Sequence, residues 1–346
     1  MKPFIYDMDQ ADWIAFVEEQ GYPAYRAGQI EAWLSRGVSQ PDEMTDLPKA
    51  MREKLADTFC FEGLVLAEKQ QSVLDETTKY VFRLADQNVI ESVLMRYHYG
   101  YSVCISSQAG CRMGCSFCAS TGAGFGRNLT DGEMLAQVSL IAKDCGQRIG
   151  HVTIMGIGEP LDNDDAVIRF IRRINRPDGL NIGLRHVSVS TCGLVPKMIK
   201  FTKEGLPVTL SVSLHAPNDS IRCQLMPVAK LYRMDEILDA CRYHTEQTGR
   251  RITFEDALFS GINDRPEHAD ELAKRLKGML CHVNLIPANA FSGGLYKPSS
   301  RPTVEAFQDR LVRKGINATI RRALGSDIMA ACGQLRRRME ECRKPL

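Results

Sequence analysis

The stretch that most constrains this chain is residues 111–118 (CRMGCSFC), in which Cys111, Cys115 and Cys118 stand at C-x3-C-x2-C spacing. The loop follows closely on an apolar run. Cysteine thiolates are the usual ligands of iron-sulfur clusters, and a cubane cluster takes four ligands. Three closely spaced cysteines therefore predict a [4Fe-4S] cluster with one iron left open for a ligand that is not protein.

Two simpler readings of the same loop compete with the cluster. A structural zinc site needs four ligands, usually in two separated pairs, and Cys145 and His151 lie far along the chain from the loop. Unrelated core cysteines would have no reason to gather in this way. The spacing resembles the signature of the radical S-adenosylmethionine (SAM) superfamily, in which the open iron binds the amino and carboxylate groups of SAM.

Composition narrows the class of protein. A chain of 346 residues suggests one large domain with an appendage. Its 44% hydrophobic and 25% charged content is typical of a globular protein, and no apolar run approaches the roughly 20 residues of a membrane span. Twelve cysteines without a visible signal peptide indicate a reducing compartment. We therefore expect a cytoplasmic location and no membrane partner.

Charge is informative only in its distribution. The net charge is +2, but residues 316–346 carry seven Arg or Lys against three acidic residues. Such a basic tail can follow nucleic-acid phosphates, or it can be an ordinary solvated end.

Periodicity predicts an α/β fold. Residues 10–58 place apolar residues at helical spacing, and residues 60–100 contain short strand-like runs. Beyond the cysteine loop, strand-like and helical runs alternate, as in a parallel sheet with crossover helices. The expected strands are 151–155, 186–190, 208–214, 252–258, 283–286 and 318–321, and the expected helices are 130–143, 164–174, 195–204, 234–247, 266–276 and 304–314. This pattern favours a partial (β/α)6 TIM-like barrel with a small N-terminal helical domain.

The same pass along the chain suggests a division into four parts. They are an N-terminal helical accessory domain (1–60), a linker hairpin (61–100), the partial barrel (101–322) and a C-terminal segment (323–346). The carboxyl ends of barrel strands usually face the active site.

Several candidate binding residues stand at those strand ends. The turn Gly156-Ile157-Gly158-Glu159-Pro160 lacks a dinucleotide fingerprint, but its glycines permit close backbone approach and Glu159 can accept a hydrogen bond from an ammonium group. Further strand-end residues are Ser190, Ser213, Leu214, His215 and Asn289. Each can equally be an ordinary hydrogen-bonded strand terminus.

At this point the chain closely resembles the RlmN/Cfr type of radical SAM RNA methyltransferase over nearly its whole length. The matching stretches are residues 104–108 (CISSQ), the three-cysteine loop, 126–129 (GRNL), 155–161 (MGIGEPL), 213–218 (SLHAPN) and 327–335 (DIMAACGQL). The resemblance implies that Cys111, Cys115 and Cys118 hold the [4Fe-4S] cluster. It also implies the set of SAM-contacting residues Gly158, Glu159, Ser190, Ser213, Leu214, His215 and Asn289.

The resemblance also gives roles to three residues that spacing alone leaves open. Cys332 matches the family's methyl-accepting cysteine, Cys104 its resolving partner and Glu91 its proton-handling carboxylate. From the residues alone, Cys332 in its small-residue turn could be an inert thiol, and Glu91 could be a surface acid.

An aromatic adenine carbon is not reactive enough for polar methylation, so a cofactor must supply radical chemistry. The resemblance implies that one SAM methylates Cys332 and that a second SAM, cleaved by reduction, yields a radical that takes hydrogen from the S-methyl group. The resulting carbon adds to adenine, Glu91 removes a proton, and Cys104 attacks Cys332 to release the base and form a transient disulfide. Two SAM molecules per turnover and an electron donor such as flavodoxin or ferredoxin are implied, and we expect a monomer.

The implied substrates are an adenosine of 23S rRNA and an adenosine of tRNA, which must leave its stack to react. We favour carbon 2 as the methylated position because it is the commoner, housekeeping activity of this family. The alternative is carbon 8 of the 23S rRNA adenosine, the antibiotic-resistance activity of Cfr-like enzymes. The helical unit and the basic tail are the natural RNA-holding surfaces.

Two other classes of function remain in view. A radical SAM enzyme acting on a protein or small molecule would need the three-cysteine loop but neither Cys104 nor Cys332. A non-catalytic iron-sulfur or zinc RNA-binding module would not cleave SAM.

Overall fold

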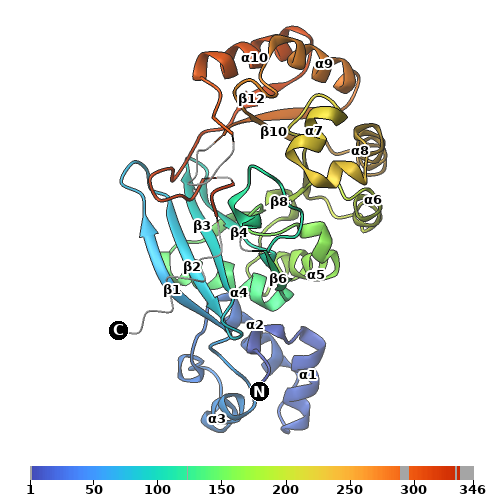
Figure 1. Cartoon of the computed structure of the whole chain (residues 1–346). Helices are drawn as coiled ribbons and strands as arrows, with labels where there is room; N and C mark the ends of the chain where they lie inside the picture. The colour runs from blue at the N-terminus through green and yellow to red at the C-terminus, as the bar shows by residue number, and fades with distance from the viewer. Residues whose placement is uncertain (1, 123, 289–295, 332, 336–346) are drawn as a thin grey trace.

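The structure is a computed structural model that describes residues 2–122, 124–288, 296–331 and 333–335. Figure 1 shows the N-terminal helices at one end, a large sheet in the middle and most of the later helices packed around the far part of the sheet. Within the described ranges, no helix combines the length and apolar character that crossing a membrane requires.

The N-terminal helices are α1 (Gln10–Glu19), α2 (Tyr25–Ser35) and α3 (Lys49–Thr58). Helix α1 begins at Asp9, whose side chain accepts from the Asp12 N–H while the Asp12 side chain accepts from the Asp9 N–H. The wholly buried Trp13 contacts the ring of Phe59 edge to face. Helix α2 contacts the first helix of the barrel, so this helical region is attached to the larger part of the molecule.

Four antiparallel strands follow, namely β1 (Leu64–Gln71), β2 (Thr78–Leu84), β3 (Val89–Tyr97) and β4 (Gly100–Ile105). Strands β2 and β3 are buried along most of their length. One face, with Tyr80 and Ile90, belongs to the main core, while Val93 and Met95 pack against the C-terminal segment. The hairpin expected as a linker therefore continues directly into the barrel sheet.

Parallel pairing begins at β4 and runs through the rest of the ten-stranded sheet, in the order β1-β2-β3-β4-β7-β8-β9-β10-β11-β12. The parallel strands after β4 are β7 (Ile149–Ile154), β8 (Val187–Thr191), β9 (Thr209–Ser213), β10 (Ile252–Leu258), β11 (Cys281–Pro287) and β12 (Ala318–Ile320). The partial (β/α)6 barrel is confirmed, with β12 as a short addition.

The helices that connect these strands are α4 (Asp131–Cys145), α5 (Asp164–Asn175), α6 (Val195–Lys203), α7 (Asp219–Leu225), α8 (Met234–Thr248), α9 (Pro266–Leu276) and α10 (Arg301–Arg313). The predicted Thr130/Glu133 capping box begins α4. The expected bounds after residue 150 agree with the observed ones to within three residues, and α7 was not predicted.

Two short strands outside the large sheet support the cysteine loop. Strand β5 (Gln108–Gly110) precedes the loop, strand β6 (Phe125–Asn128) follows it, and the two pair antiparallel. Gly110 has φ +83°, and a Cβ there would lie 1.9 Å from the Gly124 carbonyl oxygen. Only glycine fits this position, because any side chain would collide with the backbone at Gly124. This close approach of the two backbone segments closes the base of the loop.

Candidate active site

The three cysteines of the loop lie close enough to influence one another. Burial raises the pKa of the Cys111 thiol to about 12, and the neighbouring Cys118 and Glu159 add to the effect. Burial also raises the pKa of Cys115 well above its usual range, and Cys118 and Cys111 again contribute. Buried thiols of this kind become thiolates when a metal binds them. The donor set therefore fits a cationic iron-sulfur core.

A single-ion site is a poorer description of the loop. A tetrahedral zinc would bring its ligands to about 2.3 Å from one point. Over the described ranges, no three His, Cys, Asp or Glu side chains gather in a way that could hold one metal ion.

A cavity lies between the cysteine loop and the carboxyl ends of the barrel strands. Its volume is about 150 Å³, and it is open to solvent on one side. The strand-end residues lining it include Met155, Ser190, Ser213, His215, Ala257 and Ile286, and the loop and C-terminal segment add Phe117, Cys118 and Gly333. The cavity therefore joins a cluster cysteine, three predicted SAM residues and the residue next to position 332.

His215 is fixed in one tautomer at the cavity wall. The backbone N–H of Ala257 donates to its Nδ1 at 2.9 Å, so the ring proton lies on Nε2. The Phe117 ring packs edge to face against it at 4.8 Å. Burial lowers the pKa of His215 to about 3 and Arg222 contributes to the shift, so the ring is a neutral hydrogen-bond donor at physiological pH.

Glu159 is held rigidly behind the cysteine loop. Its Oε1 accepts from the Leu161 N–H at 3.0 Å, and its Oε2 accepts from the Cys192 N–H at 2.7 Å. Burial raises the pKa of Glu159, while these backbone donors oppose the rise. The preceding Gly158 has φ +110°, and a Cβ there would lie 2.6 Å from the Cβ of Gln108. The turn therefore needs glycine to approach strand β5.

The structure brings only part of the predicted SAM set together at the cavity. Ser190, Ser213 and His215 line it, whereas Gly158 and Glu159 lie beside the loop and outside the cavity wall. The Leu214 side chain belongs to the main core, and its backbone N–H donates to the Glu255 carbonyl at 3.1 Å. Asn289 and Cys332 lie outside the described residues, as does the basic tail from Arg336 onward.

Glu91 is a buried residue and not the surface acid that sequence alone allowed. It lies on β3 beside Lys79 of β2, with 4.0 Å between the Lys79 Nζ and the Glu91 Oε1. Both side chains are only 2% exposed. The Lys79 Nζ also donates to the Ile328 carbonyl at 2.6 Å. This lysine therefore connects the predicted proton acceptor to the segment that leads to position 332.

Cys104 lies on the same side of the sheet. It pairs with Val93 across β3 and β4 and shares an apolar cluster with Ala330 and Leu335. These two residues stand two before and three after position 332. The predicted resolving cysteine is therefore packed against both flanks of the predicted methyl-accepting position.

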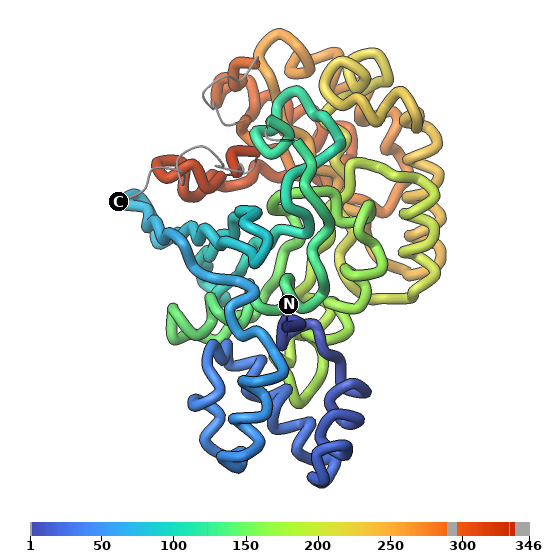
Figure 2. Tube along the Cα trace, turned by 60° about the horizontal axis from the view of Figure 1, so that its bottom comes forward, coloured from blue at the N-terminus to red at the C-terminus, as the bar shows by residue number. Residues whose placement is uncertain are grey.

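The C-terminal segment is fixed from two sides, and Figures 1 and 2 show it (red) beside the hairpin strands. From the β1–β2 turn, Ser72 Oγ and the Val73 N–H donate to the Asp327 carboxylate at 2.7 and 2.9 Å. From the cysteine loop, the Ala119 N–H donates to the Gly333 carbonyl at 2.8 Å. Ser120 Oγ donates to the Leu335 carbonyl at 2.7 Å.

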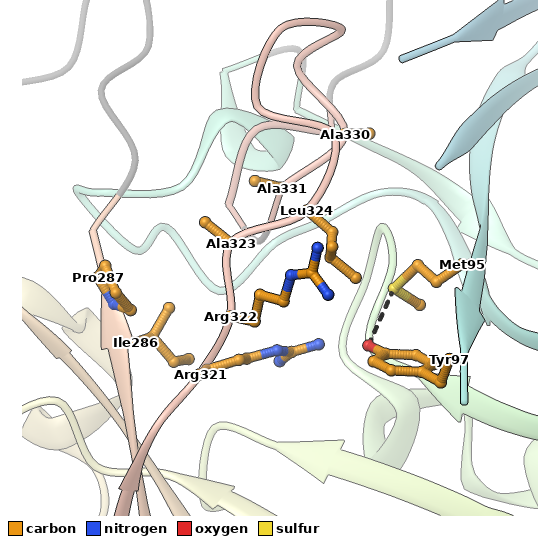
Figure 3. Close-up of a pocket in the computed structure, with 10 residues that line it drawn as sticks. All are labelled: Met95, Tyr97, Ile286, Pro287, Arg321, Arg322, Ala323, Leu324, Ala330 and Ala331. Carbon is orange, nitrogen blue, oxygen red and sulfur yellow. Dashed lines mark hydrogen bonds between the residues drawn. The ribbon is translucent and has the colours of Figure 1, made fainter. Parts of the chain in front are cut away.

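A second, small cavity of about 30 Å³, open to solvent, lies between the C-terminal segment and β3 (Figure 3). Arg321 and Arg322 extend across it toward Met95 and Tyr97, and the Tyr97 hydroxyl donates to the Met95 sulfur at 3.6 Å. Ile286 and Arg321 line both cavities. Two guanidinium groups beside an aromatic ring suit an anionic, aromatic ligand.

Sequence reasoning missed three polar residues of this site. Lys79 is a lysine within an apolar strand run, which could have signalled a buried partner. Gln108 donates to Asn128 and Asp162 and accepts from the Glu159 N–H, but a lone glutamine gives no sequence signal. Arg321 was counted only as part of a basic tail.

Known proteins agree with this geometry. The family model of the radical SAM superfamily matches residues 105–275, and that of the ribosomal RNA large subunit methyltransferase N-terminal domain matches residues 5–61. A relative from Alkaliphilus oremlandii, called "Probable dual-specificity RNA methyltransferase RlmN", is 50% identical over 318 residues, covering 92% of this chain and 93% of its own. A relative of the same name from Clostridium tetani is 47% identical over 332 residues, covering 96% and 95%.

A solved structure of a radical SAM methyltransferase from Sphaerobacter thermophilus superposes with a TM-score of 0.93 at 42% identity, covering 96% of this chain and 99% of that one. SAM-bound SuiB from Streptococcus suis shares the fold alone, at TM-score 0.50 and 14% identity over 66% of this chain and 55% of that one. These likenesses agree with the cysteine loop beside the strand ends of the barrel and with the buried Lys79 and Glu91 beside the C-terminal segment. Together they show that the chain belongs to the radical SAM superfamily and, within it, to the RlmN family of RNA methyltransferases.

Proposed function

We propose that this enzyme methylates carbon 2 of an adenosine in 23S rRNA and of an adenosine in tRNA, and that the methyl group passes through Cys332. The proposal rests on one cavity. Its wall includes Cys118, Gly333 and the predicted SAM-contacting residues Ser190, Ser213 and His215. A donor site and a carrier segment at one cavity bring the reacting groups close together.

The cofactors would be held by residues of three elements. Cys111, Cys115 and Cys118 would hold the [4Fe-4S] cluster, and the SAM set would be Gly158, Glu159, Ser190, Ser213, Leu214, His215 and Asn289. When bound, the cluster and SAM would supply the methyl group and the one-electron chemistry that an aromatic carbon requires, with two SAM molecules used per turnover. The Nε2–H of His215 can donate a hydrogen bond to SAM. The Glu159 carboxylate, which accepts from two backbone N–H groups, can also accept from an ammonium group.

The protein's own residues would carry the remaining steps. Cys332 would accept the methyl group on sulfur, and one hydrogen atom of that group would pass to the 5'-deoxyadenosyl radical. The carbon would then bond to adenine, and the radical adduct would lose one electron, which returns to the electron-transfer chain that started the reaction. Glu91 removes the proton from the substituted ring carbon, and Cys104 attacks the sulfur of Cys332. The carbon–sulfur bond breaks, a disulfide forms, and the released methyl group takes up a proton. The burial of Glu91 beside Lys79 and the packing of Cys104 against Ala330 support these assignments.

The target nucleotide would lie over the open side of the second cavity, where Arg321 and Arg322 can meet phosphate and Tyr97 can meet the base. The four-part division of the chain stays a prediction, with residues 1–60 as an RNA-holding domain. This region has six Lys or Arg against eleven Asp or Glu. Phosphate contacts there would therefore depend on particular basic side chains and not on net charge. A cytoplasmic location, a monomeric state and an electron donor such as flavodoxin or ferredoxin complete the proposal.

The direct test uses the reconstituted, reduced enzyme with SAM and unmodified 23S rRNA and tRNA fragments, followed by mass spectrometry of the digested nucleosides. We expect 2-methyladenosine in both RNAs. Cys332→Ala should cleave SAM but transfer no methyl group, whereas Cys60→Ala, at a thiol distant in sequence from the site, should methylate normally. Formation of 8-methyladenosine would establish the Cfr-like alternative, and methylation by Cys332→Ala would remove the carrier cysteine from the account.

A further inference from the structure

Arg222 of α7 is a fully buried cation, with no part of its surface exposed. Its Nη2 donates to the Cys192 carbonyl at 2.5 Å and to the Ser213 carbonyl at 3.3 Å. Its Nε and Nη1 are buried without a hydrogen-bond partner among the residues described here. Arginine remains protonated in proteins, and buried charges are normally paired. The side chain therefore has two unpartnered nitrogens, with three N–H donors between them, and needs an anion.

No carboxylate supplies that anion in the described part of the chain, where Arg222 forms no salt bridge. The nearest candidate on its own helix, Asp219, is engaged elsewhere. Its Oδ1 accepts from the Met234 N–H at 2.7 Å, and its Oδ2 lies 3.8 Å from the Arg233 Nε. A buried charge left uncompensated is strongly unfavourable. Among the described residues, no side chain balances it.

The surroundings of Arg222 point to the cysteine loop. Cys115 shares one apolar cluster with Cys192 and with Leu225, which follows Arg222 by three residues. The backbone N–H and the Oγ of Ser116 each donate to the Leu225 carbonyl at 3.0 Å. Burial lowers the pKa of Arg222, and the thiols that most oppose this effect are Cys192 and Cys115. The guanidinium is therefore held beside the loop that would carry the cluster.

We propose that Arg222 is the charge partner of the iron-sulfur cluster and favours its reduced state. This inference rests on the cluster assignment within the proposed function and not on the methyl-transfer chemistry. An oxidised cubane core has two positive charges against three thiolates, so the bound cluster has a net charge of minus one, which becomes minus two on reduction. A fixed neighbouring cation stabilises both states, and the reduced state more. Charge and hydrogen bonds to sulfur are established determinants of cluster potential.

The test compares wild type, Arg222→Met and Arg222→Lys, each with and without the reconstituted cluster and all without SAM. Thermal unfolding should show that Arg222→Met is neutral or stabilising in the cluster-free protein, because an apolar side chain replaces an uncompensated charge. Cluster loading should then raise the midpoint temperature of the wild type more than that of Arg222→Met. In an EPR-monitored redox titration, the ratio of reduced to oxidised cluster at a fixed potential should fall at least tenfold in Arg222→Met, equivalent to 59 mV for one electron. Arg222→Lys should retain most of the wild-type ratio.

Arg173→Met is the matched control. Arg173 is a partly buried arginine whose side chain is 9% exposed, but its Nη1 lies 2.9 Å from the Asp131 Oδ2 and its partners do not depend on the cluster. Its replacement should destabilise both states equally and leave the potential unchanged. If Arg222→Met does not fold, Arg222→Gln, which can still donate to the Cys192 carbonyl, decides the same question.

The proposal is overturned if cluster loading stabilises the uncharged variant as much as the wild type and the potential does not move. It is also overturned if the coupling appears only after SAM is added, since the anion would then be the SAM carboxylate. A wild-type protein that binds no iron and sulfide would instead contradict the proposed function and remove this inference with it.

Discussion

Replacing Cys118 by alanine should abolish the iron-sulfur cluster and reduce RNA methylation to the detection limit. Cys118 is the predicted cluster ligand that lines the cavity with Ser190 and Ser213. A cubane held by three protein thiolates already has one open iron, and two remaining thiolates cannot retain it. The measurements are iron and sulfide content after anaerobic reconstitution, the visible absorbance of the cluster, and methyl transfer to the RNA fragments.

Cys145→Ala is the control for general effects of losing a thiol. Cys145 ends α4, is half-buried, and its sulfur donates to the Ala142 carbonyl at 3.6 Å. This variant should bind the same amount of iron as the wild type. If the Cys118→Ala protein kept a full cluster and normal methylation, neither cluster binding nor methyl transfer would depend on this loop.

Replacing Glu91 by glutamine should slow turnover by about 10²–10⁴-fold and trap RNA covalently on the enzyme. Glutamine keeps the size of the side chain but cannot take up a proton. Glu91 is positioned by Lys79, which also donates to the Ile328 carbonyl. If proton removal precedes the attack by Cys104, the step before it should still occur and the adduct should accumulate. A denaturing gel of labelled RNA, with and without protease, measures it.

Glu68→Gln is the matched substitution on the same sheet, at an exposed position of β1, two strands from β3. It should turn over at the wild-type rate and form no lasting adduct. Normal turnover by Glu91→Gln, or loss of activity without any adduct, would assign proton removal to another group.

The barrel was predictable from sequence because each of its strands and helices has its own hydrophobic period. The runs at residues 252–258 and 266–276 give β10 and α9 their observed bounds. Short elements without a period could not be found in this way. Strands β5 and β6 have three and four residues, and their pairing depends on the close crossing at Gly110.

A local sequence pattern likewise could not show that both faces of the hairpin are buried. Strands β2 and β3 lie between the main core and the C-terminal segment, which is more than 200 residues away in sequence. That long-range contact buries Lys79 and Glu91 as a pair.

The residues of the candidate site likewise include some that the sequence could predict and some that it could not. The three-cysteine loop and the strand-end residues Ser190, Ser213 and His215 could be singled out because motif spacing and strand position mark them. Arg222 could not, since its burial and its two unpartnered nitrogens follow from the packing of α7 against the loop. Charge balance around a site is a property of the folded chain.

The central claim is that the transferred carbon loses a hydrogen while it is bound to Cys332. SAM with a fully deuterated methyl group, followed by mass spectrometry of the RNA product and of the released 5'-deoxyadenosine, tests it most directly. The account predicts a product methyl group with two deuterium atoms and one hydrogen, and the missing deuterium in 5'-deoxyadenosine. A product methyl group that keeps all three deuterium atoms would contradict it.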